Sequence, residues 1–361
     1  MTRRLRWAVL LSVCLLAGSA GVLVIAGAEG DPKCSMAAGK GRIGGSDGAD
    51  MITMTDDELS DVLSEAKAAG MWSVRVDVDW SRVEPTAGQR DWTDVDRVVR
   101  AVSSHGMCTL GLVTYAPAWA ADPAARPSGN YFAPRDPRTF ADFARAAAQR
   151  YRADVAVWEV WNEPNTEKFF KPRPNAAQYG RLLAATYAAI KSVGADIGVI
   201  SGGLAPAEDN GRDIAPTTFL QALYDGGYSA SFDAFGIHPY SYPALPNAPG
   251  TRGWNTAARL PLMRDTMVAG GDAAKSIWIT ECGAPTGGAA VAVSEDTQAQ
   301  TIGIVFRMAR DTPWIGPAFV FAIRDSGNDV DDPEQNFGIL RHDLSRKPAY
   351  AVVSEWGNRG Q

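Results

Sequence analysis

The feature that most constrains the fold is an alternation of eight short apolar runs with amphipathic stretches. The runs are continuous rather than alternately apolar and polar, which indicates strands of a parallel sheet that is covered on both faces. We expect strands at 42–45, 73–78, 108–113, 155–161, 197–203, 232–238, 276–281 and 317–324. Eight strands, each followed by a helical pattern, predict an α/β fold with a single (β/α)8 TIM barrel.

The stretches between the runs carry helix signals. Thr55 and Glu58 have capping-box spacing at the start of the first stretch, and Gly70 ends it. The second stretch presents valines at helical spacing and stops at Gly106. Further helices are expected at 140–151, 176–193, 218–225, 256–268, 297–309 and 348–356. An open doubly wound sheet is the alternative, but the Gly-rich segment after the first run lacks the spacing of a phosphate-binding turn.

The N-terminus has the pattern of a targeting segment. Arg3, Arg4 and Arg6 precede an apolar run over 7–28, which predicts export of the downstream chain. Small residues within the run resemble cleavage sites, but the whole run is long enough to span a bilayer, for which about 20 apolar residues suffice. We therefore expect 1–28 to be a signal peptide or a single transmembrane anchor. The protein would then be secreted, or anchored to the cytoplasmic membrane by 7–28.

Length, charge and missing motifs limit the number of domains and the classes of partner that we expect. We expect a linker over 29–41 and one barrel domain over 42–361, without an internal repeat. The net charge is −6 and no basic block follows the N-terminus, which argues against nucleic acid as a partner. The sequence contains no HExxH, P-loop or dinucleotide motif, so we expect no metal and no cofactor. We expect a monomer.

Three cysteines lie outside the apolar N-terminal run. Cys34 precedes the first expected strand and Cys108 begins the third, so both would lie at the N-terminal end of the barrel. A Cys34–Cys108 disulfide suits an oxidising compartment, and three free thiols are the alternative. Cys282 is more typical of a small packed residue than of a nucleophile.

Polar and aromatic residues gather where the expected strands end. In a (β/α)8 barrel the C-terminal ends of the strands form one rim, and the active site is built there. Residues at or just after these ends are Arg75, Tyr115, Trp119, Asn162, Glu163, His238, Tyr240, Glu281, Arg324 and Asp325. Two glutamates, an arginine, a histidine, an asparagine and several aromatic rings are therefore expected at one rim.

Several of these residues belong to recognisable motifs. The sequence WNEPN at 161–165, with WITE far downstream at 278–281, resembles clan A of the glycoside hydrolases. FDAFGIHPY at 232–240, NFGIL at 336–340 and KPAY at 347–350 are similar to family 39 and the bacterial exopolysaccharide glycosidases near it, with family 5 as the neighbouring choice. The resemblance covers roughly 42–356.

The resemblance implies a role for each residue of these motifs. It makes Glu163 the acid/base and Glu281 the nucleophile of a retaining O-glycosidase, in which one carboxyl must be protonated while the other is ionised. It places Asn162 on the sugar 2-hydroxyl, with His238 and Tyr240 in the subsite where the bond breaks. We expect Arg75 and Tyr240 to hold Glu281 ionised through charge and hydrogen bonding.

The contacts to the sugar are less well defined. Tyr115 and Trp119 are candidates for stacking on a sugar ring. Many clan members end strand eight with an aromatic residue, but here this strand has no Trp or Tyr. Phe321 is expected to replace that residue, or Arg324 and Asp325 to make polar contacts instead.

These patterns together predict a retaining glycoside hydrolase that acts on a cell-surface or cell-wall polysaccharide. Two alternatives stay open: a transglycosylase with the same covalent intermediate, and a carbohydrate-binding barrel without activity. The sequence leaves open the sugar, the linkage, and endo versus exo action.

Overall fold

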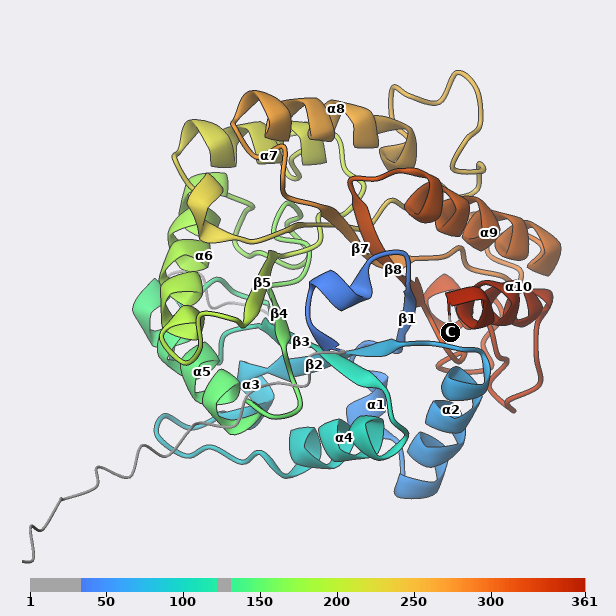
Figure 1. Ribbon diagram of the computed structural model, residues 1–361, viewed down its shortest axis with the longest axis horizontal. Coiled ribbons are helices and arrows are strands. Elements are labelled where there is room, and N and C mark those ends of the chain that lie inside the picture. Colours follow the sequence, from blue (N-terminus) through green and yellow to red (C-terminus); the bar gives the residue numbers. More distant parts are fainter. Residues whose placement is uncertain (1–33, 122–130, 361) are drawn as a thin grey trace, which may run out of the picture.

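A computed structural model describes residues 34–121 and 131–360 of the chain (Figure 1). The expected targeting segment at 1–28 lies outside the described residues. Among the helices that the structure does describe, none is both long enough and apolar enough to cross a membrane.

Eight parallel strands form a ring in the order β5-β4-β3-β2-β1-β8-β7-β6. Their bounds are β1 Ile43–Ser46, β2 Ser73–Asp79, β3 Cys108–Thr114, β4 Val157–Val160, β5 Gly198–Ser201, β6 Phe235–Ile237, β7 Ile277–Cys282 and β8 Ile315–Phe321. Two parallel bridges, Ile200–Ala234 and Leu204–Ile237, join β5 to β6 and close the ring. The predicted (β/α)8 barrel is therefore confirmed, and the open doubly wound sheet is excluded.

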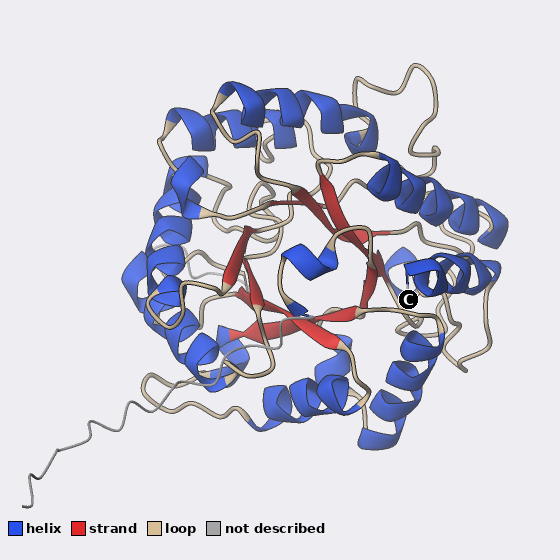
Figure 2. Cartoon of the chain, in the orientation of Figure 1, coloured by secondary structure: helices blue, strands red, loops and turns tan. Residues whose placement is uncertain are grey.

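The helices surround the ring of strands (Figure 2). Their bounds are α1 Asp50–Thr53, α2 Asp56–Ala68, α3 Trp80–Val83, α4 Thr93–Ser104, α5 Pro137–Arg150, α6 Ala176–Lys191, α7 Pro216–Asp225, α8 Thr256–Ala269, α9 Glu295–Asp311 and α10 Pro348–Gly357. The short 3-10 turns within the described residues are η2 Ala37–Gly39, η4 Ser229–Ser231, η5 Pro333–Gln335 and η6 Asn358–Gly360. The Thr55–Glu58 capping box begins α2 as predicted.

Strand β2 shows how the sequence separates the core from the interior of the barrel. Val74, Val76 and Val78 belong to the large apolar core that also contains the buried faces of α2 and α4. Successive strand side chains point to opposite faces, so Arg75 and Asp77 face the barrel interior instead. The same strand thus anchors two helices and brings two charged side chains to the axis.

The N-terminal end of the barrel is closed by an apolar plug. The segment that contains η2 lies across the middle of the ring in Figure 1, before the chain enters β1. Met36 and Cys34 pack there with barrel residues such as Trp278 and Phe319. Cys34 forms a disulfide with Cys108, with Cα atoms 5.4 Å apart, which decides between the two alternatives for the cysteines. The second half of the segment predicted as a linker thus lies against the barrel.

Strand β8 ends earlier than predicted. It stops at Phe321: the N–H of Arg324 donates to Oδ1 of Asp47 at 3.0 Å, and the N–H of Ile323 is shared between Oδ1 of Asp47 at 2.7 Å and the carbonyl of Ser46 at 3.1 Å. The side chain that follows β1 therefore turns the chain out of the barrel, and Arg324 leaves the rim on which the sequence placed it.

Candidate active site

A cavity of about 580 Å³ opens at the C-terminal ends of the strands. All eight strand ends, or the loops that follow them, contribute residues to its lining, including eight polar or aromatic side chains that belong to six of these ends. These are Arg75 and Asp77 of β2, Tyr115 after β3, Asn162 and Glu163 after β4, Tyr240 after β6, Glu281 of β7 and Phe321 of β8. The rim predicted from the sequence is thus hollow and lined with carboxylates and aromatic rings.

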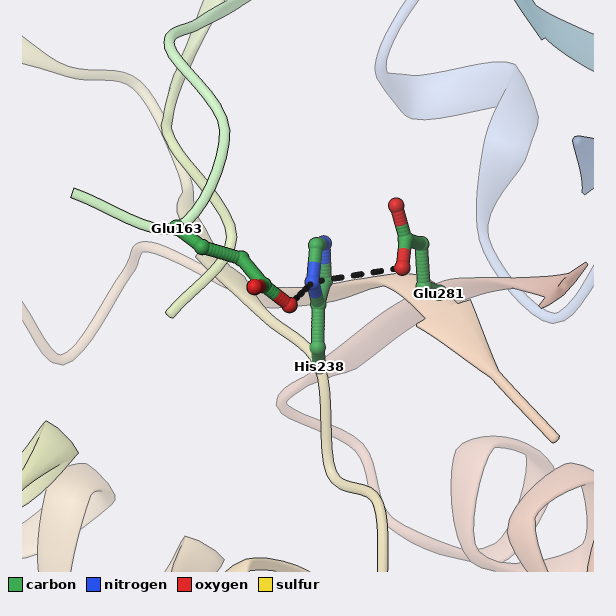
Figure 3. A group of neighbouring side chains, drawn as sticks. All are labelled: Glu163, His238 and Glu281. Atoms are coloured by element: carbon green, nitrogen blue, oxygen red, sulfur yellow. Dashed lines mark hydrogen bonds and ion pairs between the residues drawn. The ribbon is translucent and has the colours of Figure 1, made fainter. Parts of the chain in front are cut away.

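Glu163 and Glu281 face each other across His238 (Figure 3). Nδ1 of His238 lies 2.9 Å from Oε1 of Glu163 and 3.4 Å from Oε2 of Glu281. One oxygen of each glutamate and this nitrogen all lie within 4.8 Å of one another. The two carboxyls therefore face one small volume, although they are 118 positions apart in the chain by residue number.

Arg75 organises the base of the site. It is 1% exposed, and its three donating nitrogens have three different acceptors. Nε donates to Glu159 at 2.7 Å, Nη1 to Glu281 at 2.7 Å and Nη2 to Asn162 at 2.9 Å. A buried guanidinium is retained only when it is paired and hydrogen-bonded, and these contacts meet that requirement.

The charge on Glu281 is set by its neighbours. Burial raises the pKa of this carboxyl, but the charges of His238 and Arg75 and the Tyr240 hydroxyl outweigh burial and hold its pKa below the usual range. The Tyr240 hydroxyl donates to Oε2 at 2.8 Å. Arg75 and Tyr240 thus both contact Glu281, as the sequence predicted, and an ionised carboxylate is favoured.

His238 is held by a chain of hydrogen bonds. Its Nε2 lies 3.1 Å from Oγ1 of Thr280, whose hydroxyl donates to Glu159 at 3.0 Å. Because the Thr280 proton is used there, Nε2 is assigned as the N–H donor to Thr280. Burial lowers the pKa of His238, but Glu281 and Glu163 raise it by more. Nδ1 can therefore exchange a proton with Glu163.

Gly203 leaves room for this histidine. A Cβ at this position would lie 2.2 Å from Nε2 of His238 and 2.6 Å from Oγ1 of Thr280. Its backbone N–H donates to Glu159 at 2.8 Å, and its carbonyl accepts from the N–H of Glu163 at 3.1 Å. A glycine is thus required for β5 to approach the site closely.

The backbone at the ends of β3 and β4 is strained. Tyr115, Trp161 and Glu163 have φ values of 51°, 73° and 47°, in the left-handed region that bulky residues rarely occupy. Such conformations cost about 1–3 kcal/mol each and cluster at functional sites. Here they turn the Tyr115 and Glu163 side chains into the cavity.

Asn162 is oriented by Arg75. Its amide oxygen accepts from the guanidinium, so the amide N–H₂ group is the part left to donate to a ligand. This orientation agrees with the predicted contact between Asn162 and a sugar hydroxyl.

Two predicted contact residues lie elsewhere. Trp119 does not line the cavity, because its Nε1 donates to the carbonyl of Glu84 at 2.8 Å and its ring packs edge-on against Trp80. Arg324 is turned away towards Glu58, with Nη1 3.9 Å from its carboxylate. Phe321 reaches the cavity instead and packs against Phe337, with ring centroids 5.4 Å apart. Asp325 pairs with Lys347 at 2.8 Å.

Sequence reasoning missed Glu159 as part of the site. This fully buried glutamate accepts from Arg75, Thr280 and the backbone of Gly203. A signal was present, since an acidic residue in an apolar run must have a buried partner. The partner could not be named because it lies on another strand.

Glu163, His238 and Glu281 are also the described residues whose donor atoms are close enough to hold a metal ion. Two carboxylates and an imidazole would suit a transition metal such as zinc. The hydrogen bonds to Tyr240, Arg75 and Thr280 account for the orientation of Glu281 and His238 in terms of proton chemistry.

Comparison with known proteins places this geometry in context. No model of a protein family and no curated protein matches the sequence. Among solved structures, a family 39 glycoside hydrolase from the gut symbiont Bacteroides cellulosilyticus WH2 is 25% identical, with a TM-score of 0.70 over 88% of this chain and 63% of the other. The chain has the fold of clan A glycoside hydrolases.

Other matches extend the comparison to a second family. A monomeric beta-xylosidase from Caulobacter crescentus CB15 is 17% identical, with a TM-score of 0.67 over 88% of this chain and 67% of that one. GH5_18 from Streptomyces cattleya, solved with GlcNAc, is 20% identical, with a TM-score of 0.65 over 88% and 80%. The resemblance to families 39 and 5 is thus confirmed at the level of the fold. The chain spans less than two thirds of the Bacteroides protein.

Proposed function

We propose that the protein is a retaining glycoside hydrolase in which Glu163 is the acid/base and Glu281 the nucleophile. The observation that carries the proposal is that both carboxyls face Nδ1 of His238, with one oxygen of each within 4.8 Å of the other. Retaining enzymes separate their carboxyls by about 5–5.5 Å, whereas inverting enzymes need about 6.5–9.5 Å to admit a water molecule.

The first step forms a glycosyl-enzyme. An oxygen of ionised Glu281 attacks the anomeric carbon while the bond to the leaving oxygen breaks, and Glu163 gives its proton to that oxygen. Arg75 and Tyr240 hold the attacking carboxylate in place through Oε1 and Oε2 respectively.

The second step releases the sugar. Glu163, now ionised, takes a proton from a water molecule. The oxygen of that water attacks the anomeric carbon, and the bond between this carbon and Glu281 breaks. His238 supports both states of Glu163 through the 2.9 Å contact of Nδ1. Neutral imidazole accepts from the protonated glutamate. After Glu163 has given up its proton, imidazolium that has taken a proton from solvent donates to the ionised glutamate.

The substrate and the location are further parts of the proposal. We propose an oligo- or polysaccharide of the cell surface or cell wall, cleaved by a monomer that is exported and secreted, or anchored to the cytoplasmic membrane by 7–28. The arginines and the apolar run at the N-terminus support export. A transglycosylase would share the intermediate and pass the sugar to another sugar, which product analysis with excess acceptor distinguishes.

The test is hydrolysis of a panel of 4-nitrophenyl glycosides and envelope polysaccharides by the full chain. Glu281→Gln and Glu163→Gln should each lower kcat by about 10²–10⁴-fold. With the wild type, NMR should show that the sugar released first has the same anomeric configuration as the substrate, before mutarotation. The matched control is Glu65→Gln on α2, where Glu65 pairs with Arg346 at the surface, and its rate should stay within about two-fold. An inverted product, or full activity in Glu281→Gln, would overturn the assignment.

A further inference from the structure

Asp77 is a carboxylate of the cavity that has no partner among the described residues. It is 8% exposed and lines the cavity beside Arg75 and Tyr115. Its Oδ1 is buried with no hydrogen-bond partner, and within residues 34–121 and 131–360 neither of its oxygens forms a hydrogen bond or an ion pair. The neighbouring buried Glu159 accepts three hydrogen bonds, so Asp77 differs from the other interior carboxylate near it.

Arg75, the nearest cation on the same strand, does not donate a hydrogen bond to Asp77. All three of its nitrogens already donate, to Glu159, Glu281 and Asn162. Its charge acts on Asp77 only through space. Burial raises the pKa of Asp77 to about 7, Arg75 lowers it, and the charge of Glu281 raises it.

A buried polar atom without a partner destabilises a folded protein, and nearly all such atoms in native structures are satisfied. An unsatisfied buried group calls for an explanation, such as a role in catalysis or a bound molecule that supplies the missing partner. Asp77 is directed at the cavity rather than at the core, because it shares the interior face of β2 with Arg75. A ligand in the cavity is therefore the group that can supply the missing donor.

We propose that Asp77 is a substrate-binding residue that accepts a hydrogen bond from a ring hydroxyl of the sugar held between Glu163 and Glu281. The proposal rests on the function proposed above and adds a requirement to it. The sugar must carry a free hydroxyl on the side that faces β2. A neutral hydroxyl fits, whereas a sugar carboxylate at that point would meet Asp77 and Glu281 with like charge.

The test compares Asp77→Asn with Asp79→Asn in the full chain. Asp79 lies two residues along the same strand, and its Oδ1 is already satisfied by Ser81 at 2.8 and 2.7 Å. On the 4-nitrophenyl glycoside that the wild type cleaves fastest, Asp77→Asn should lower kcat/KM on the order of 10- to 100-fold. Asp79→Asn should stay within about three-fold.

Two further readouts separate binding from a structural role. Monodeoxy versions of the same glycoside should include one whose loss of activity in the wild type disappears in Asp77→Asn, because the contact is then already missing. The unliganded Asp77→Asn protein should melt at the same or a higher temperature than the wild type, since an unsatisfied carboxylate is removed.

The outcomes are distinct. Equal kcat/KM for the two variants, additive losses at every deoxy position, or a lower melting temperature for Asp77→Asn would each overturn the proposal. If the wild type cleaves nothing, the proposed function fails. Thermal shifts with millimolar xylo-, manno-, galacto- and gluco-oligosaccharides then decide the role of Asp77. Shifts that vanish only in Asp77→Asn support it, and no shift in the wild type overturns it.

Discussion

The two ends of the barrel are built on opposite principles. The N-terminal end is apolar and covalently closed, with Met36, Trp278 and Phe319 packed around the Cys34–Cys108 disulfide. The C-terminal end buries a guanidinium, an imidazole and several carboxylates around a cavity. Both ends share the same eight strands, so the difference comes from which strand residues face the interior at each end and from the segments that precede or follow the strands.

The comparison teaches where stability and chemistry lie in this chain. Apolar burial and a cross-link stabilise without any need for an open volume. Buried charges stabilise only while every partner is present, and they are retained for what they do to a ligand. Substitutions at the N-terminal end of the barrel, here called the bottom, should therefore change only the free energy of unfolding. Substitutions at the C-terminal end around the cavity, here called the mouth, should change both the free energy of unfolding and the activity.

The largest effect is expected for Arg75→Met. Removing the guanidinium leaves Glu159 and Glu281 buried without their cation, which should cost about 3–5 kcal/mol of unfolding free energy and abolish measurable activity. Urea unfolding and the aryl glycoside assay measure the two losses. Arg90→Met is the control, because Arg90 pairs with Glu84 away from the cavity while partly exposed, and it should cost about 1 kcal/mol or less. Full activity in Arg75→Met would contradict the statement that the buried charges at this end of the barrel are needed for activity.

A smaller effect, confined to stability, is expected at the bottom. The disulfide spans 74 positions, and its removal in the Cys34→Ser/Cys108→Ser double variant should lower the unfolding free energy by about 2–4 kcal/mol. kcat and KM at 25 °C should be unchanged, because the bond lies at the opposite end of the strands from Glu163 and Glu281. A matching loss of kcat in the folded double variant would show that the two ends are coupled.

The smallest effect for each group involved is a dependence of stability on pH that arises at the mouth. Burial raises the pKa of Asp47 and of Asp77 to about 7, from an ordinary value of 3.8. The folded state therefore binds more protons than the unfolded state between pH 4 and 7, so this stabilisation is present below pH 4 and is lost as the pH rises through 7. The pKa of His238 is raised as well, which acts in the same direction. Glu281 opposes it only below about pH 4.5, where its stabilising ionised form is lost.

The unfolding free energy should accordingly fall by about 2 kcal/mol for each of the two aspartates between pH 5.5 and 8. The Asp47→Asn/Asp77→Asn double variant should lose most of this slope, whereas the cysteine double variant should keep it. Thermal unfolding at several pH values measures all three proteins. A slope that persists in the aspartate variant would place its origin elsewhere.

The sequence predicted the barrel and most of the residues that line the cavity at its C-terminal end, because both depend on local patterns. Apolar runs and helix signals are local, and so is the position of Glu163 or Glu281 at the end of a run. Strand ends were less predictable, since β8 is ended by the side chain of Asp47, which is distant in sequence.

Contacts across the barrel were the part that local patterns could not give. Glu159 and Thr280 complete the site through partners on other strands, and only the closed barrel brings them together. Trp119 and Arg324 have side chains long enough to find partners away from the cavity, in Glu84 and Glu58. For long polar side chains, a place near the rim does not fix a direction.

The central claim is that Glu281 is the nucleophile of a double displacement. The most direct measurement is peptide mass spectrometry after incubation with a 2-deoxy-2-fluoro aryl glycoside of the sugar that is cleaved fastest. The slowed second step should leave the fluorosugar covalently attached to the peptide that contains Glu281, and the label should be absent in Glu281→Gln. A label on Glu163 or on another carboxylate, or rapid turnover without any covalent adduct, would contradict the account.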